Sequence, residues 1–197
     1  PDFPSVAAAV VSPLVEDGDI LLVHPDGGGS FTLTKSLAVL AAAGTHFNAS
    51  TISVEDVVSF SLSGARATRV LIDRVHSRGR VNDLRAGTVY FDGYGGVYNI
   101  GRTDILDCAE LVVSNSAFFG SDGCYPESGD VDPACVVSGS RVVFVDSLLI
   151  GGDAAGNGCP THYPVSGAGL VVAGGSDVQV VACQVWGGYT FAGISFP

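Results

Sequence analysis

A nine-residue segment that occurs three times constrains the fold more than any other feature of this chain. The copies are spaced 31 and 36 residues apart, and they are VVSNSAFFG at 112–120, VFVDSLLIG at 143–151 and QVVACQVWG at 179–187. A recurring strand with a recurring turn predicts a solenoid, in which each repeat buries its apolar face only against its neighbours. Val113, Phe144 and Val180 should then lie over one another.

The composition suits an ordered chain of short strands. Hydrophobic residues make up 47% and charged residues only 15%, which excludes disorder, and 27 glycines favour tight turns. There is no linker, low-complexity run or shift in composition, so residues 1–197 are expected to form one domain. Besides the repeats, strands are predicted at 20–23, 31–33, 37–40, 51–54, 57–62, 69–73, 87–91, 170–173 and 191–194.

A short helix is predicted at 5–16, ahead of the strands. Ser5 can cap its N-terminus, and Pro13 limits it to one or two turns. The ends of a stack of strands are open edges that need cover. We therefore expect 5–16 to be a capping helix on the first end, and 17–197 to form the coils.

Two stretches carry a family resemblance. VVSPLVEDGDILLVHP at 10–25 and GSRVVFVDSLLIGG at 139–152 resemble the opening and one coil of secreted bacterial proteins of the pectin-lyase-like superfamily. The resemblance implies an all-β fold, a right-handed parallel β-helix (solenoid) with a short N-terminal capping helix. The long spacings are assigned to loops at 121–133 and 153–167. An antiparallel β-sandwich is the alternative, because strands punctuated by glycine do not fix strand direction.

The charge excludes several partners. The net charge is −11 and Lys35 is the single lysine, so the chain should not bind nucleic acid, which requires clustered basic residues. The longest apolar runs, 6–11 and 37–43, are far shorter than the ~20 residues that span a bilayer, so no membrane insertion is expected. The low pI and the scarcity of lysine fit a secreted surface or a saline setting, and a secreted, extracellular or cell-surface location is expected.

Five cysteines divide into two groups. Cys124, Cys135 and Cys159 lie in polar loops, where cysteines of secreted chains commonly form disulfides. The pairing Cys124–Cys159 is predicted, with Cys124–Cys135 as the alternative. Cys108 and Cys183 lie in strand-like segments and are expected to be buried free thiols. No spacing of Cys or His matches a metal site.

Candidate catalytic residues come mainly from the resemblance. Lyases of this superfamily hold calcium with clustered Asp and use an Arg or Lys base, and the nearest arrangement here is Asp73 and Arg74 with His76. The hydrolase motifs Asn-Thr-Asp and Gly-His-Gly are absent. We expect no cofactor; the alternative is calcium bound by oxygen ligands from Asp153, Asn157 and the stretch 127–132.

Aromatic residues gather late in the sequence. Phe119 and Trp186 occupy matching repeat positions, which favours a stack in the core. Tyr163 and Tyr189 are the candidates for exposed carbohydrate contacts.

Together these patterns predict a non-enzymatic structural or adhesive β-helix module. Copies are expected to self-associate end to end through the C-terminal coil, forming a filament. The alternatives are a polysaccharide lyase or hydrolase that acts on acidic polysaccharide, and a carbohydrate-binding module.

Overall fold

The computed structural model describes residues 2–91, 97–122, 131–153 and 166–188, and these are mostly β-strand. Its elements, in chain order, are α1 (Val6–Val11), β1 (Ile20–Val23), the 3₁₀ turn η1 (Pro25–Gly27), β2 (Phe31–Leu33), β3 (Ala38–Ala41), β4 (Phe47–Ser63), β5 (Ala65–Asn82), β6 (Arg85–Ala86), β7 (Thr88–Phe91), β8 (Val97–Ile100), β9 (Arg102–Leu106), β10 (Leu111–Ser114), β11 (Ala117–Phe119), β12 (Cys135–Ser138), β13 (Arg141–Val145), β14 (Leu148–Ile150), β15 (Leu170–Ala173), β16 (Asp177–Val181) and β17 (Gln184–Trp186).

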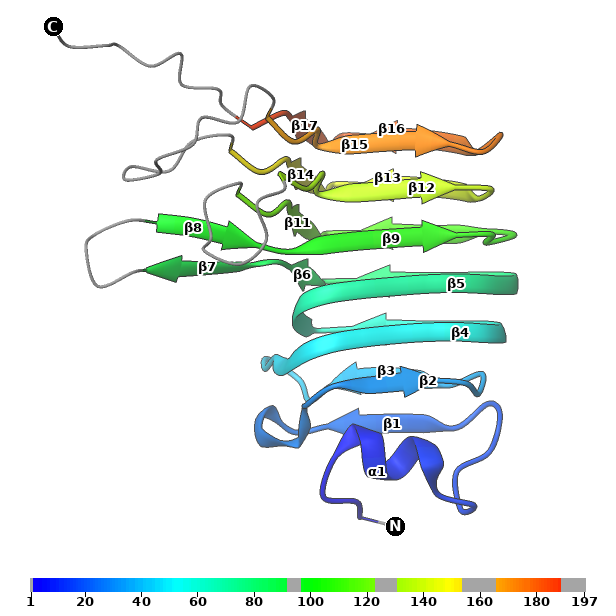
Figure 1. Cartoon of the computed structure of the whole chain (residues 1–197). Coiled ribbons are helices and arrows are strands. Elements are labelled where there is room, and N and C mark those ends of the chain that lie inside the picture. Colours follow the sequence, from blue (N-terminus) through cyan, green and yellow to red (C-terminus); the bar gives the residue numbers. More distant parts are fainter. Residues whose placement is uncertain (1, 92–96, 123–130, 154–165, 189–197) are drawn as a thin grey trace, which may run out of the picture.

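Fifteen strands join one parallel sheet that follows three faces of the molecule, in layers that rise from α1 (Figure 1). Face A contains β2, the middle of β4, the middle of β5, β9, β12 and β15. Face B contains β1, β3, the ends of β4 and β5, β10, β13 and β16. Face C is short and contains the starts of β4 and β5, β6, β11, β14 and β17.

The register confirms the stacking predicted from the repeats. Val113 pairs with Phe144, and Phe144 pairs with Val180, all through parallel strands. The antiparallel sandwich is therefore wrong: among the described strands, only β7 and β8 pair antiparallel. The long stretches that separate successive strands in this region lie between β11 and β12 and between β14 and β15, where the two loops were assigned from the sequence.

The N-terminal helix is shorter than predicted. It spans six residues, Val6–Val11, instead of 5–16; Ser5 caps it by accepting from the amide of Ala8 at 3.2 Å. The chain becomes extended at Ser12, as expected for a residue before proline. α1 lies below β1 and buries Val6 and Val10, so it covers part of the first layer (Figure 1).

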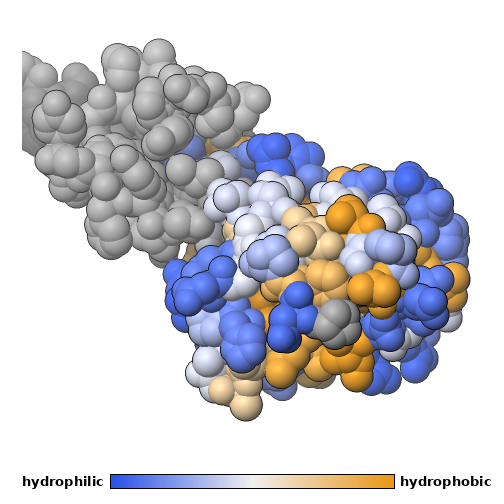
Figure 2. All heavy atoms as spheres, turned by 90° about the horizontal axis from the view of Figure 1, so that it is seen from below, coloured by the Kyte–Doolittle hydropathy of each residue, from blue (hydrophilic) through white to orange (hydrophobic). Residues whose placement is uncertain are grey.

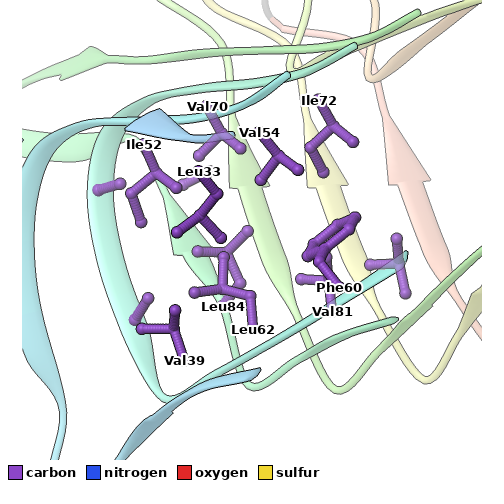
Figure 3. Packing of buried hydrophobic residues seen from close by; sticks show 14 of the residues in the cluster. Leu33, Val39, Ile52, Val54, Phe60, Leu62, Val70, Ile72, Val81 and Leu84 are labelled. Atoms are coloured by element: carbon purple, nitrogen blue, oxygen red, sulfur yellow. The ribbon is translucent and has the colours of Figure 1, made fainter. Parts of the chain in front are cut away.

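The core lies between faces A and B. Side chains alternate inward and outward along each strand, and the inward ones from the two faces meet (Figure 3). Leu33, Ile52 and Val54 on face A are fully buried, as are Val39 and Leu62 on face B. Burial of each such side chain contributes roughly 1.5–3 kcal/mol.

The chain turns one corner where it enters face B and another where it leaves face B. At both corners a residue has the left-handed backbone conformation. Non-glycine residues with positive φ are Asp56, Arg74, Asp83, Asp107, Asn115, Asp146 and Ala182. In the upper layers a Ser or Cys follows each of these corner positions. The Ser147 hydroxyl, for example, donates to the carbonyl of Val145 at 2.8 Å and accepts from the amide of Ser116, in the layer below, at 3.2 Å. We call such side chains, each of which forms a hydrogen bond with the backbone of the layer below, rungs. Two columns of rungs tie the upper layers together: Ser116, Ser147 and Cys183 at one corner, and Cys108, Ser140 and Ser176 at the other.

Candidate functional site

The three predicted catalytic residues meet at the corner between faces A and B. Asp73 ends the face A part of β5, Arg74 has a left-handed φ of 52°, and His76 follows. Arg74 contacts Asp73 directly and lies 3.9 Å from Asp56, measured from Nε to Oδ1. His76 Nε2 lies 2.8 Å from the same Asp56 oxygen. Asp56, one layer below, therefore joins the cluster that was predicted from Asp73, Arg74 and His76.

Sequence reasoning did not single out Asp56, because its proximity to Arg74 follows from the register of two strands. Asp56 lies 18 residues before Arg74, and Glu55 and Val57 pair in register with Asp73 and Val75. The parallel register of β4 with β5 thus places Asp56 beside Arg74. The sequence alone does not give this register, so Asp56 could not be predicted as a neighbour of Arg74.

The cluster is a surface network of ion pairs. The hydrogen bond between Asp56 and His76 is the main cause that holds the pKa of Asp56 below its ordinary value. Desolvation opposes this lowering, and the charges of His76 and Arg74 add to it. Asp56, Arg74 and His76 are exposed, and only Asp73 is mostly covered. Arg74 lies beside both Asp56 and Asp73, and His76 is hydrogen-bonded to Asp56. The arrangement can present a histidine and a guanidinium to a ligand, but it encloses no reaction space.

Basic residues are concentrated in one layer. Although the net charge is −11, six of the nine Lys and Arg residues lie in β5 and β6, within the twenty positions 66–85. They are Arg66, Arg69, Arg74, Arg78, Arg80 and Arg85. This cluster of arginines circles the molecule, since β5 runs through all three faces and β6 lies on face C.

These six arginines differ in whether a carboxylate lies close enough to neutralise their charge. Arg78 pairs with Glu110 at 2.9 Å, and Arg74 belongs to the corner cluster. Among the described residues, no carboxylate lies within ion-pair distance of Arg66, Arg69, Arg80 or Arg85.

Arg102 carries a different network, next to the first loop assigned from the sequence. Its Nε donates to both Asp104 oxygens at 3.0 Å, and Nη1 lies 3.3 Å from Asp132 Oδ1. Hydrogen bonding to Asp104, with the charges of both carboxylates, raises the pKa of Arg102. Asp132, the last residue of the predicted calcium-binding stretch, therefore already faces a cation from the chain itself.

The other calcium candidates lie where the long loops leave the sheet. Asp153 donates its backbone amide to the carboxylate of Asp122 at 2.7 Å, and Asp122 is buried. Asn157 and residues 127–130 lie outside the described residues. Within the parts of the chain that the structure describes, no group of three His, Cys, Asp or Glu side chains is arranged to hold a metal ion.

The cysteines are described in part. Cys124 and Cys159, the predicted disulfide partners, lie outside the described residues. Cys135, the partner in the alternative pairing, is a fully buried free thiol on face A, and burial strongly raises its pKa. Cys108 is also buried and free, as predicted, whereas Cys183 is free and only half-buried.

The aromatic stack predicted from the repeats is wrong. Phe119, Ile150 and Trp186 are in register, but they point outward, and Trp186 is 52% exposed. Phe118, one position earlier, is the buried ring, and it packs edge-on against Phe144 with 6.1 Å between centroids. A slip of one residue along a strand exchanges the inner and outer faces. Tyr163 and Tyr189, the predicted carbohydrate contacts, lie outside the described residues.

A groove of about 670 Å³, lined by both polar and apolar residues, lies between α1 and β1, where the helix incompletely covers the first layer. Val6 and Ala9 line it from α1, and Leu21 and Val23 line it from β1. Figure 2 shows the apolar residues gathered at this end of the molecule. Large exposed apolar side chains in the first forty residues are Val11, Leu14, Ile20 and Leu22.

No protein-family model, curated protein or solved structure matches the chain. In the described part of the chain, no helix has the length and apolar character needed to cross a bilayer.

Proposed function

We propose that the protein is a non-enzymatic structural or adhesive module, extracellular or on a cell surface, that associates with copies of itself. We further propose that it is one domain, a right-handed parallel β-helix of the pectin-lyase-like kind. The solenoid is supported by the order of the strands, since the chain passes through faces A, B and C in the same order in successive layers. The right hand follows the strong preference of parallel crossover connections.

The observation that carries self-association is the exposure of the last described layer. Among the described residues, β15, β16 and β17 pair only with the layer below them, so in this part of the chain the backbone N–H and C=O groups of their opposite edges have no strand partner. Val172 and Val180 are 49% and 44% exposed, whereas Val137 and Phe144, directly below them, are fully buried.

A second copy of the chain is the occupant that fits this layer. Its strands have the same spacing, and stacking would bury the valines and pair the free backbone groups, as each layer does within the molecule. A contact between unlike ends does not close on itself, so repetition produces a filament.

Analytical ultracentrifugation across a wide range of concentrations, with electron microscopy of the same samples, tests this proposal. We expect the average mass to rise with concentration and rods to appear, and the double variant Val172→Lys/Val180→Lys to remain monomeric. Val58→Lys is the control, because Val58 is also an exposed valine, 61% exposed, but lies in β4, away from the last layer. A wild-type chain that remains monomeric at the highest concentration overturns the self-association.

The extracellular location is tested separately. A tagged full-length natural protein is expected in the culture medium or on intact cells that are labelled from outside. Recovery only from the soluble fraction of lysed cells contradicts that part of the proposal.

The corner cluster supports a second candidate, an enzyme that acts on acidic polysaccharide. The hydrogen bond between His76 and Asp56, next to Arg74 and Asp73, is the observation that favours it. A panel of polysaccharides is assayed for unsaturated and reducing ends, with and without calcium. Activity that is lost in His76→Gln and Arg74→Gln supports the enzyme, and inactivity on the whole panel ends it. A carbohydrate-binding module would instead give glycan-array binding that depends on Tyr163 and Tyr189.

A further inference from the structure

The stacking of two unneutralised arginines on face C points to a ligand. Arg66 and Arg85 are directly paired across neighbouring parallel strands, and both are exposed. Paired residues of adjacent strands point to the same side, with backbones about 4.8 Å apart, so the two arginine side chains leave the same face from neighbouring layers. Like charges placed opposite each other in a sheet are destabilising.

The rest of the molecule avoids such an arrangement. Arg141 stacks against Asp177, with Nε 3.5 Å from the carboxylate, and Arg78 is matched by Glu110. Arg69 does stack below another arginine, Arg102, but Asp104 and Asp132 already neutralise Arg102. Among the described residues, Arg66 and Arg85 are thus the stacked pair of arginines in which neither side chain lies within ion-pair distance of a carboxylate. A chain with 20 acidic residues does not lack counter-charges.

Arg85 is also held in a fixed orientation. Its guanidinium carbon lies 5.1 Å from the ring centroid of Phe119, a cation–π contact on the outside of face C. A stacked guanidinium keeps its N–H edge free for a bidentate bond to an oxyanion. Phe119 adds an apolar surface beside that edge.

We propose that Arg66 and Arg85 bind a carboxylate or sulfate group of an acidic polysaccharide, whose sugar ring rests against Phe119. One anionic group would lie between the two guanidinium groups and relieve their repulsion. Arg69, around the corner on the same strand, is placed to meet a neighbouring charge of the polymer. A sugar polymer is the chosen ligand, because two arginines beside one aromatic ring suit a single charged sugar unit, whereas nucleic-acid binding depends on many Lys and Arg contacts and this chain has nine such residues against 20 acidic ones. This binding is independent of self-association, because β5 and β6 lie away from the last layer.

Fluorescence anisotropy at low salt tests the proposal with four labelled probes of equal length. They are a heparin-derived sulfated oligosaccharide, a carboxylated alginate oligosaccharide, a neutral maltooligosaccharide and single-stranded DNA. We expect one or both acidic sugars to bind and the neutral sugar not to bind. The stronger of the two acidic probes identifies the group as sulfate or carboxylate.

The double variant Arg66→Gln/Arg85→Gln is expected to lower the affinity about 100-fold, on the basis of about tenfold for each charged hydrogen-bonding group. Arg80→Gln/Arg141→Gln is the matched control, because it removes the same charge from exposed positions on face B. An equal loss in the control overturns the site in favour of diffuse attraction. DNA binding as tight as that of the sugars overturns the choice of ligand, and absence of binding to both acidic sugars overturns the proposal itself. Circular dichroism of each variant verifies folding, and ultracentrifugation of the double variant should show unchanged self-association.

Discussion

The lower layers, up to β5, and the upper layers, from β9 onward, turn the same corner with different side chains. Both use a left-handed residue, Asp56 or Arg74 below and Asp107 above. In the lower layers, a buried valine follows it and adds to the core. In the upper layers, Cys108 and its stacked counterparts follow it and hydrogen-bond between layers.

The difference teaches how one backbone turn can be stabilised in two ways. β4 and β5 continue through their corners as strands of 17 and 18 residues, and apolar side chains fill the inside. The upper strands are only three to five residues long, so more backbone groups must be satisfied at the corners. The buried serine hydroxyls supply those bonds. We therefore expect the two regions to respond differently to mutation.

The largest effect is expected from large-to-small changes in the core of each region. Phe144→Ala above and Phe47→Ala below each remove a fully buried ring, and each should cost about 3–5 kcal/mol in the free energy of unfolding. Because each described layer of the parallel sheet pairs with the layers directly above and below it, the damage should remain local. Hydrogen exchange should show lost protection in β12–β16 for Phe144→Ala and in β2–β5 for Phe47→Ala. Equal loss throughout both regions would mean that the stack unfolds as one unit.

The next effect separates the two kinds of corner. Ser147→Ala leaves the buried amide of Ser116 without its acceptor and should destabilise the fold by about 1–3 kcal/mol, measured by urea unfolding. Ser147→Cys should lose less, because Cys183 already fills this position one layer above. Ser63→Ala, whose half-buried hydroxyl accepts only from Asn82 at 3.3 Å, is the control and should change stability by no more than about 0.5 kcal/mol. A Ser147→Ala effect no larger than the control would remove the structural role of the rungs.

The strand stacking could be predicted from the sequence because the three copies preserve it. Val113, Phe144 and Val180 occupy the same place in each copy, and the period alone aligns them. The rungs were visible in the same copies as Ser116, Ser147 and Cys183, one position after the left-handed residue. Their role could not be predicted, because it depends on which amide lies below each hydroxyl.

The candidate sites were less predictable for the same physical reason. Arg66 and Arg85 become neighbours only through the register of β5 with β6, outside the repeated segments. The inversion of Phe118 and Phe119 shows a second limit. Both positions are apolar in each copy, so the pattern does not distinguish the inward face from the outward face.

A smaller, stabilising effect is expected at the left-handed corners. Ala182 has φ of 53°, a conformation that costs an L-residue about 1–2 kcal/mol and costs glycine almost nothing. After the extra chain entropy of glycine is subtracted, Ala182→Gly should stabilise by up to about 1 kcal/mol. Ala173→Gly, in β15 of the same layer, has ordinary strand geometry and should destabilise. Thermal unfolding of both variants checks the sign, and a loss of stability in Ala182→Gly would contradict the assigned corner conformation.

The smallest effect concerns pH, at the lower corner that has charges in place of rungs. His76 and Arg74 lower the pKa of Asp56 in the folded chain from its ordinary 3.8. A carboxyl with a depressed folded pKa stabilises the fold above its unfolded pKa, and this stabilisation is lost as the pH falls through the folded pKa. Asp56→Asn should therefore be less stable than wild type at pH 6, and the gap should narrow in the acid range below about pH 4. Asp146→Asn, at a left-handed corner of the upper layers, provides the baseline for replacing an aspartate in this conformation. Urea unfolding at a series of pH values measures both gaps; a gap for Asp56→Asn that stays constant from pH 6 to pH 2 would show that the ion pairs of this corner contribute nothing to the fold.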